Sequence, residues 1–263
     1  MHFTKYNGLG NDFIFLDQAV SSSIRQPGAL ARRLCNRRTG IGADGLVLLL
    51  PSSKADVRMR IINSDGSEAE MCGNASRCVP LYLLSKGLTN KKQITLETLA
   101  GIIQTDVLDQ ARGLVRVNMG PAQQTQLAVC AQAAGKSWIG TKVSMGNPHF
   151  VVVVDEVENV ALEQVGPLLE THPLFPDKTN VEFVQILDKN TVRMRVWERG
   201  VGVTQACGTG ACATAVACIL NHLTERKISV HLDGGTLYIE WPDQQAVFMT
   251  GPAAQVFEGE INL

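Results

Sequence analysis

Residues 57–74 read VRMRIINSDGSEAEMCGN, and residues 192–209, which lie 135 positions later, read VRMRVWERGVGVTQACGT. The two segments align without a gap and share six identical residues in 18, where average residue usage predicts roughly one. The chain therefore contains two homologous halves of about 130 residues, because matches in the same order at similar offsets indicate an internal repeat. Three further pairs of segments match in this way: 10–17 with 146–155, 94–104 with 228–239, and 119–123 with 249–255.

The bulk composition is that of an ordinary globular protein. Of 263 residues, 45% are hydrophobic and 19% are charged, and the formal net charge is −1. This balance gives no reason to expect a nucleic-acid partner. The longest apolar runs are strand-length, far short of the ~20 apolar residues of a membrane span. Residues 1–13 lack the basic and apolar regions of a signal peptide, so we expect a cytoplasmic protein that binds neither nucleic acid nor membrane.

Short apolar runs bounded by Gly, Pro, Asn or Asp predict a strand-rich fold in both halves. Helices are expected at 27–38, with Pro27 near the start, and after Cys72 as far as Gly87. Pro80 inside the second segment predicts a kink or a late start. The expected fold class is α/β (α+β): two pseudo-symmetric homologous domains, each a mixed β-sheet wrapped around a central helix. The expected strands are 12–17, 45–51, 57–62, 93–100 and 113–119, then 143–154, 181–187, 191–197, 228–232 and 236–241, with helices near 160–171 and 209–222.

The repeat places two of the seven cysteines, Cys72 and Cys207, at the same structural point. Each follows a strand-and-turn segment and opens a helix. The first N–H groups of a helix lack internal partners, and the helix dipole there favours negative charge. A thiol at that point is expected to be acidified, and the adjacent amides form a site suited to a carboxylate or phosphate. The odd cysteine count and the expected compartment argue against a disulfide framework.

Three chemical interpretations compete for these cysteines. Zinc would need Cys72, Cys78, Cys207 and Cys212, but neither pair would share a helix face, and structural zinc prefers pairs held by a tight turn. A single nucleophilic cysteine with His149 as its base explains one cysteine and leaves its repeat partner without a role. The third interpretation uses both thiols, one on each side of a planar carbanion.

In the third interpretation, one sulfur removes a proton and the other supplies one to the opposite face, which inverts a carbon next to a carboxylate. The carboxylate would bind at the two helix N-termini, which help to delocalise the developing charge. No organic cofactor is expected, because the chain carries no dinucleotide or P-loop glycine signature and no lysine in a Schiff-base context. No metal is expected either, given the spacing of the cysteines.

The whole chain resembles the diaminopimelate epimerases, pyridoxal-independent amino-acid epimerases of lysine and peptidoglycan-precursor biosynthesis. The resemblance implies two pseudo-symmetric domains, a homodimer, and interconversion of LL- and meso-2,6-diaminopimelate. The last strand is implied to return to the first domain, which gives domains 1–118 plus 255–263, and 119–254. The motifs that carry the resemblance are KYNGLGNDF (5–13), GIGADG (40–45), NSDGSEAEMCGNASRC (63–78), VSMGNPHF (143–150), TNVEFV (179–184) and WERGVGVTQACGTGACA (197–213).

The resemblance also implies residue roles. Cys72 and Cys207 are implied as the two catalytic acid–base groups, with His149 as a supporting residue that orients or tunes rather than transfers the substrate proton. Asn63 and Glu198 are implied near the α-amino group, with Glu198 orienting it. The remaining substrate contacts are implied for the amides of Gly73, Asn74, Gly208 and Thr209 at the α-carboxylate, and for Asn11, Asn147, Asn180 and Arg199 at the distal amino-carboxylate arm.

Other interpretations of these residues stay open on the sequence. Asn11, Asn63 and Asn147 are typical of turns beside Gly or Pro, and Glu198 with Arg199 would suit an exposed ion pair. A racemase of another amino acid, such as histidine, and a cysteine hydrolase are the alternative activities. The chain departs from the family pattern at Ala75 (usually Gly), Gly45 (a distal-arm Gln in some members), Val203 (often acidic) and Phe257 (a dimer-contact Tyr in some relatives).

Overall fold

A computed structural model describes residues 1–243 and 245–262. Two residues, Gln244 and Leu263, lie outside the described residues. Leu263 is the last residue of the expected C-terminal strand. The chain forms two compact units. Unit 1 comprises Met1–Val117 with Gly251–Leu263, and unit 2 comprises Asn118–Thr250.

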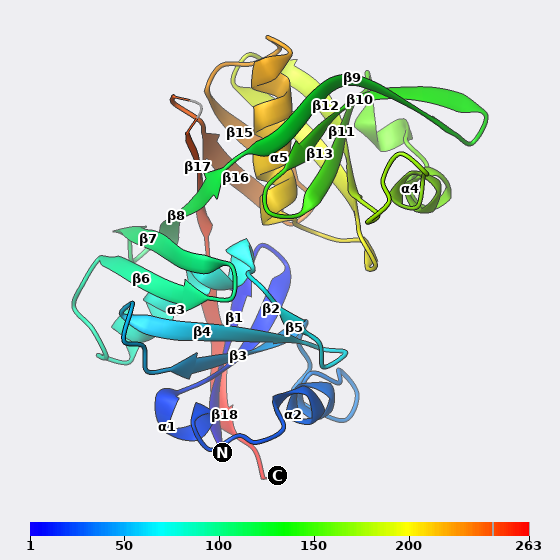
Figure 1. Ribbon diagram of the computed structural model, residues 1–263. Coiled ribbons are helices and arrows are strands. Elements are labelled where there is room, and N and C mark those ends of the chain that lie inside the picture. Colours follow the sequence, from blue (N-terminus) through cyan, green and yellow to red (C-terminus); the bar gives the residue numbers. More distant parts are fainter. Residues whose placement is uncertain (244, 263) are drawn as a thin grey trace. The chain divides into compact units, whose positions relative to one another are not determined.

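Unit 1 is a mixed sheet of eight successively paired strands. Its first strand in space, β18, is the last in the sequence, and Figure 1 shows this red strand beside the blue β1. The pairs β2–β3 and β4–β6 are parallel, and the other neighbouring strands of this sheet are antiparallel. In spatial order the strands are β18 (Ala254–Glu260), β1 (His2–Gly8), β2 (Asn11–Leu16), β3 (Gly45–Leu50), β4 (Val57–Asn63), β6 (Gln93–Thr98), β7 (Gly101–Asp109) and β8 (Leu114–Pro121), with the short β5 (Glu68–Ala69) on β4.

Unit 2 repeats this topology strand for strand. Its parallel pairs are β11–β12 and β13–β15, at the same two places in the order. The mixed sheets and the repeated order confirm the predicted fold class of two homologous halves. The strands are β9 (Gln123–Ala133), β10 (Lys136–Ser144), β11 (Pro148–Val153), β12 (Asn180–Asp188), β13 (Thr191–Glu198), β15 (Lys227–Leu232), β16 (Gly235–Glu240) and β17 (Ala246–Pro252), with β14 (Gly202–Val203) on β13.

A buried helix lies against each sheet. In unit 1 it is α3 (Gly73–Ser85), and in unit 2 it is α5 (Gly208–Leu220), which contacts strands β10 to β13, β15 and β16. Figure 1 shows α5 surrounded by strands of its own unit. Because almost every residue of these helices is buried, small and apolar side chains occupy all their faces.

Short outer helices cover the opposite face of each sheet. Unit 1 carries α1 (Gln18–Ser21) and α2 (Pro27–Leu34), which begins at Pro27 as predicted. Unit 2 carries the 3₁₀ turn η1 (Val157–Asn159) and α4 (Leu162–Glu170). Side chains of a strand alternate between its two faces, so β12 directs Phe183 into the apolar cluster that contains α4 residues and Glu182 toward α5.

Two local expectations need correction. The single strand expected at 143–154 was wrong: β10 ends at Ser144, Gly146 has a φ of +92°, and β11 starts at Pro148. The Gly-Asn-Pro segment at 146–148 interrupts the apolar residues with a turn, in line with the turn interpretation of Asn147, and Gly146 supplies the left-handed backbone it needs. Pro80 does not delay α3, which starts at Gly73, whereas the stop at Gly87 is confirmed by its φ of +66°.

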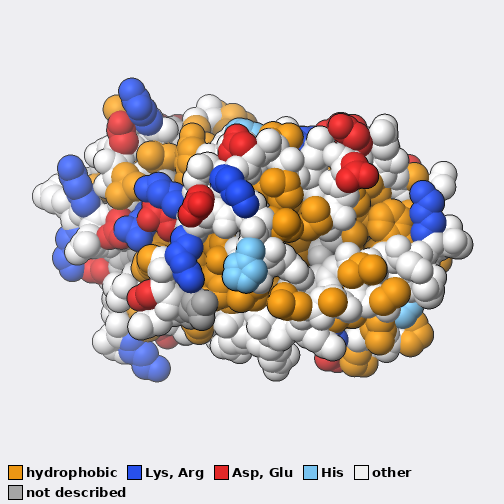
Figure 2. Space-filling view, turned by 90° about the horizontal axis from the view of Figure 1, so that it is seen from above, with side chains coloured by type: hydrophobic (Ala, Val, Ile, Leu, Met, Phe, Trp, Pro, Cys, Tyr) orange, Lys and Arg blue, Asp and Glu red, His pale blue; other side chains and the backbone are white. Residues whose placement is uncertain are grey.

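The surface has mixed charge. In Figure 2, basic and acidic side chains are interspersed on the face shown, in keeping with the net charge of −1. Within residues 1–243 and 245–262, the longest apolar helices fall short of what is needed to cross a bilayer.

Candidate active site

Cys72 and Cys207 occupy the same position in the two units. Each is the residue immediately before a buried helix and has an extended backbone, with φ/ψ of −140°/116° for Cys72 and −120°/112° for Cys207. Gly73 and Gly208 are the first helical residues, so in each unit the amides of the first turn, which have no acceptor within the helix, start beside the sulfur. The equivalence expected from the repeat is therefore present in the structure.

In unit 1, Asn11 at the start of β2 meets the first turn of α3. Its side-chain oxygen lies 3.8 Å from the Cys72 sulfur and accepts a hydrogen bond of 3.1 Å from the Asn74 amide. Its own amide nitrogen donates to Asp44 at 2.8 Å. Asp44 thus fixes which end of the Asn11 side chain faces the thiol.

An ionic cluster holds Asp44 in place. Arg37 contacts both Asp44 and Asp12 at 2.8 Å, and Lys5 contacts Asp12 at 2.8 Å. Burial raises the pKa of Asp12, but the hydrogen bonds from Arg37 and Lys5 outweigh it and lower the pKa to about 2. Asp44 belongs to the GIGADG motif, but the sequence alone assigned it no role. The available signal was an acidic residue between Gly42 and Gly45, directly before a buried strand.

Asn63 does not join this group through its described contacts. It ends β4 in an exposed turn, where its side-chain amide donates to the Ser67 hydroxyl at 3.0 Å and its backbone N–H donates to the Ser67 carbonyl at 2.8 Å. The described contacts of Asn63 are therefore those expected of a turn residue.

In unit 2, Cys207 is only 5% exposed. The Gly210 N–H donates to its sulfur at 3.3 Å, and the Thr209 hydroxyl lies 3.6 Å from the same atom. Glu198, at the end of β13, accepts a hydrogen bond from the Thr204 hydroxyl. The structure therefore brings Thr209 close to this thiol, and Glu198 is also within hydrogen-bonding reach of Cys207.

The expectation of an acidified thiol is wrong for Cys207. Burial raises its pKa well above the ordinary value, and the carboxylates of Glu198 and Glu182 raise it further. The Gly210 and Thr209 hydrogen bonds act in the opposite direction but are weaker. Burial also raises the pKa of Glu198, because water no longer stabilises its charge. A helix N-terminus alone does not offset this desolvation.

Behind Cys207 lies a buried pair that the sequence analysis only half identified. The His149 Nδ1 atom is 2.7 Å from Glu182 Oε1, and both side chains are fully buried. His149 Nε2 is 3.0 Å from the side-chain oxygen of Asn147, whose amide donates to the Thr209 hydroxyl at 3.3 Å. His149 was expected near the thiols, but Glu182 was missed. Its signal was a carboxylate at a buried position inside the apolar run 181–184.

Asn180 and Arg199 lie beside each other at the end of the parallel pair. The Asn180 amide donates to the Pro148 carbonyl at 2.8 Å, and its oxygen accepts from the Arg199 N–H at 3.0 Å. The Arg199 guanidinium is on the surface and donates to the Asp177 carbonyl at 3.1 Å. Asn180 is therefore held by the backbone, whereas the Arg199 side chain faces solvent.

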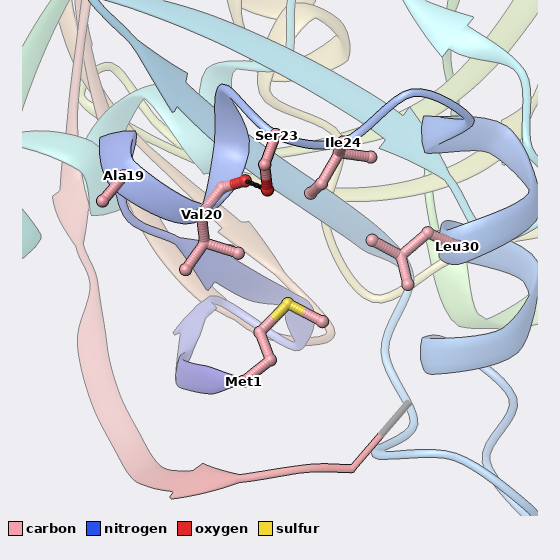
Figure 3. Close-up of a pocket in the computed structure, with 6 residues that line it drawn as sticks. All are labelled: Met1, Ala19, Val20, Ser23, Ile24 and Leu30. Carbon is pink, nitrogen blue, oxygen red and sulfur yellow. Dashed lines mark hydrogen bonds between the residues drawn. The ribbon is translucent and has the colours of Figure 1, made fainter.

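Among the described residues, neither a metal-ligand cluster nor the cavity in unit 1 adds a residue to the sites around Cys72 and Cys207. In the described parts of the chain, no three His, Cys, Asp or Glu side chains are grouped so that they could hold a metal ion. A cavity of about 570 Å³ lies in unit 1. Figure 3 shows its lining of five apolar residues and Ser23, whose hydroxyl donates a hydrogen bond to the Val20 carbonyl. None of the expected site residues lines it.

The fold is shared with a class of solved structures that includes a probable proline racemase. The chain matches a phenazine biosynthesis protein of the PhzF family from Bacillus anthracis with a TM-score of 0.79 at 17% identity, over 100% of this chain and 99% of that one. It matches a probable proline racemase from Agrobacterium radiobacter K84 with a TM-score of 0.74 at 18% identity, over 100% and 93% of the two chains. At these identities the likeness establishes the fold.

Sequence comparison then narrows the class to one family. The family model described as diaminopimelate epimerase matches residues 3–125 and 141–256. A diaminopimelate epimerase from Phocaeicola vulgatus is 54% identical over 276 aligned positions, covering 99% of this chain and 98% of that protein. The chain belongs to the diaminopimelate epimerase family.

Proposed function

We propose that the protein interconverts LL- and meso-2,6-diaminopimelate, with Cys72 and Cys207 as the two acid–base groups and no organic cofactor. The observation that carries the proposal is the equivalence of the two cysteines, each the residue before a buried helix with the first amides of that helix beside it. Membership of the family supports the substrate.

The proposed reaction moves two protons. The thiolate of one cysteine takes the α-proton and becomes a thiol, and the electron pair left on carbon delocalises into the α-carboxylate. The thiol of the other cysteine gives its proton to the opposite face of the carbon and becomes a thiolate. The amides of Gly73 and Asn74 and of Gly208 and Thr209 would bind the carboxylate and stabilise its extra charge. Each sulfur acts as the base for one epimer and as the acid for the other.

The remaining side chains would hold the rest of the substrate. Asn63 and Glu198 would bind the reacting α-amino group. Arg199 would bind the distal carboxylate, since a guanidinium binds a carboxylate through two parallel hydrogen bonds, and its exposed side chain supports this role. Asn11, Asn147 and Asn180 would line the same arm, with Asn180 acting through the backbone that it fixes.

An assay on purified protein without pyridoxal phosphate tests the proposal. Epimerisation of diaminopimelate in heavy water should incorporate solvent deuterium at the α-carbon. Cys72→Ala and Cys207→Ala should each lower kcat by at least ~10³-fold, whereas Cys130→Ala, on an exposed strand position, should match the parent. Full activity in either cysteine variant at the helix starts would refute the two-thiol mechanism.

Two further assays separate the alternatives. Turnover of histidine but not diaminopimelate in an amino-acid panel would indicate the related racemase, and Arg199→Ala should then be harmless. A covalent adduct on Cys207 seen by mass spectrometry during turnover would indicate a hydrolase.

The proposal also includes a cytoplasmic homodimer. Support for the dimer comes from β18, which exposes Val256 and Phe257 at 54% and 44%. Light scattering measures the oligomeric state, and cell fractionation measures the location.

A further inference from the structure

A continuous series of polar contacts connects Glu182 to the Cys207 sulfur. It runs from Glu182 through His149, Asn147 and Thr209, with donor–acceptor separations of 2.7, 3.0 and 3.3 Å and a final separation of 3.6 Å at sulfur. Two of its members are fully buried, so water does not compete at that end.

The direction of these hydrogen bonds follows from the Asn147 side chain. Its nitrogen donates to the Thr209 hydroxyl oxygen, and its oxygen therefore accepts from His149 Nε2, which must carry a proton. The Thr209 hydroxyl, having accepted from Asn147, keeps its own hydrogen for the Cys207 sulfur. The arrangement thus presents a donor to Cys207.

The other end of the series requires a second proton. With Nε2 protonated, a neutral His149 would turn the lone pair of Nδ1 toward a Glu182 carboxylate 2.7 Å away, which is repulsive. A proton between the two atoms removes the repulsion. It also limits the charge that is buried, since Glu182 Oε2 has no hydrogen-bond partner among the described residues, and an isolated buried carboxylate is costly. The hydrogen bond to Glu182 therefore fixes the His149 ring with its Nε2 atom toward Asn147.

Unit 1 shows that the pair is not a requirement of the fold. In the parallel pair β2–β3, Phe13 lies opposite Gly45, as His149 lies opposite Asn180 in β11–β12. Val47 lies opposite Ile61, as Glu182 lies opposite Val196. Apolar residues thus fill in unit 1 the two positions that hold the buried pair in unit 2.

We propose that Glu182 is a positioning residue that holds the His149 ring with Nε2 toward Asn147 and, through Asn147, directs the Thr209 hydroxyl at the Cys207 sulfur. Without this carboxylate, Nε2 can become a hydrogen-bond acceptor and Asn147 reverses, so that Thr209 donates to Asn147 and no longer to sulfur. The charged groups that face this series are Glu198, Glu182 and Cys207 itself. The series counteracts the burial that otherwise disfavours the Cys207 thiolate, and this role rests on the proposed function of Cys207.

The test measures the pKa of Cys207 through its rate of alkylation by iodoacetamide against pH, with the modified residue assigned by mass spectrometry. Thr209→Val should raise that pKa by about one pH unit, tenfold less thiolate at a given pH, and Thr209→Ser should restore it. Glu182→Gln should also raise it, and should no longer raise it in a Thr209→Val background, because this effect of Glu182 acts through Thr209. Glu170→Gln, the same substitution at another buried glutamate of unit 2, should leave it unchanged.

The opposite sign would overturn the proposal. If Glu182 acts only through its negative charge, Glu182→Gln lowers the pKa of Cys207 and does so equally with Thr209→Val. No change on either substitution would refute the proposal as well. The ¹⁵N shifts of His149 give a second readout: Nε2 should carry a proton in the parent, and an Nε2 that accepts a hydrogen bond would contradict the proposal. Neither measurement needs turnover, so their failure is distinct from a failure of the epimerase assay.

Discussion

At the scale of single residues, burial decides more than position on a helix. Cys207 occupies a helix start, where the dipole favours a thiolate, yet burial and two neighbouring carboxylates raise its pKa. Asp12 shows the opposite balance. It is also largely buried, with a side chain 16% exposed, but two cations bind it directly. Whether a buried group stays charged therefore depends on how well its charge is hydrogen-bonded.

Asp12→Asn should destabilise the protein by about 2 kcal/mol at pH 7. The pKa of Asp12 is lower in the folded state, about 2, than in the unfolded chain. Its contribution is therefore complete above the unfolded value and is lost as the pH falls through the folded value. Urea unfolding should show the parent and the variant converging as the pH falls below 4. Asp155→Asn, at an exposed position, should change stability by only a few tenths of a kcal/mol; a difference for Asp12→Asn that is independent of pH would contradict the ionic explanation.

At the scale of elements, the two equivalent helices differ three residues after the cysteine. That position is Ala75 in α3 and Gly210 in α5. A Cβ on Gly210 would lie 2.7 Å from Glu182 Oε1 and 3.1 Å from the Cys207 sulfur. In unit 1 the corresponding strand residue is the apolar Val47, and the helix accepts an alanine that is fully buried. The glycine of α5 is thus required by the carboxylate on β12.

Gly210→Ala should lower epimerase activity by at least tenfold with little loss of stability. The methyl group displaces Glu182 and the sulfur, which costs ~1–3 kcal/mol as overpacking, while the helix gains up to ~1 kcal/mol in propensity. Activity and thermal unfolding of the same sample separate the two effects. Ala75→Gly serves as the control: it should lose about 1 kcal/mol of stability and retain most activity. An active Gly210→Ala enzyme would show that the contact is not tight.

Some elements and contacts could be predicted from the sequence, and others could not. The repeat predicted the paired helices and their cysteines because a six-residue identity at a fixed offset survives in the local sequence. The expected strand 143–154 ran through the turn at Gly146 because apolar residues on both sides continue the strand pattern, although Asn147 was recognised as a possible turn residue. Glu182 was missed because its partner His149 lies 33 residues away and meets it only through the parallel pairing of β11 with β12. Such pairing is set by the sheet, so the carboxylate inside the apolar run 181–184 does not indicate which residue it pairs with.

At the scale of the whole molecule, the two units share a topology but differ in chain order. In unit 2, the strand next to β10 is β9, which precedes it through a short hairpin. In unit 1, the strand next to β1 is β18, from the other end of the chain. Unit 1 therefore forms only when residues about 250 positions apart pair, and closing so long a loop costs entropy and slows folding. The C-terminal segment is also fixed to α3, since Arg77 donates to the Pro252 carbonyl at 3.2 Å.

Truncation after Ala253 should therefore destabilise unit 1 selectively. It removes the β1–β18 ladder, the contact between the Phe3 and Phe257 rings and the Lys86–Glu258 ion pair. Hydrogen exchange read by mass spectrometry should show lost protection in β1, while β12 and α5 stay protected, because every strand of that sheet lies within the remaining chain. Unit 2 thus serves as the internal reference. Equal loss of protection in both units would mean that the molecule unfolds as one cooperative body, and unchanged protection in β1 would mean that β18 contributes little to the sheet.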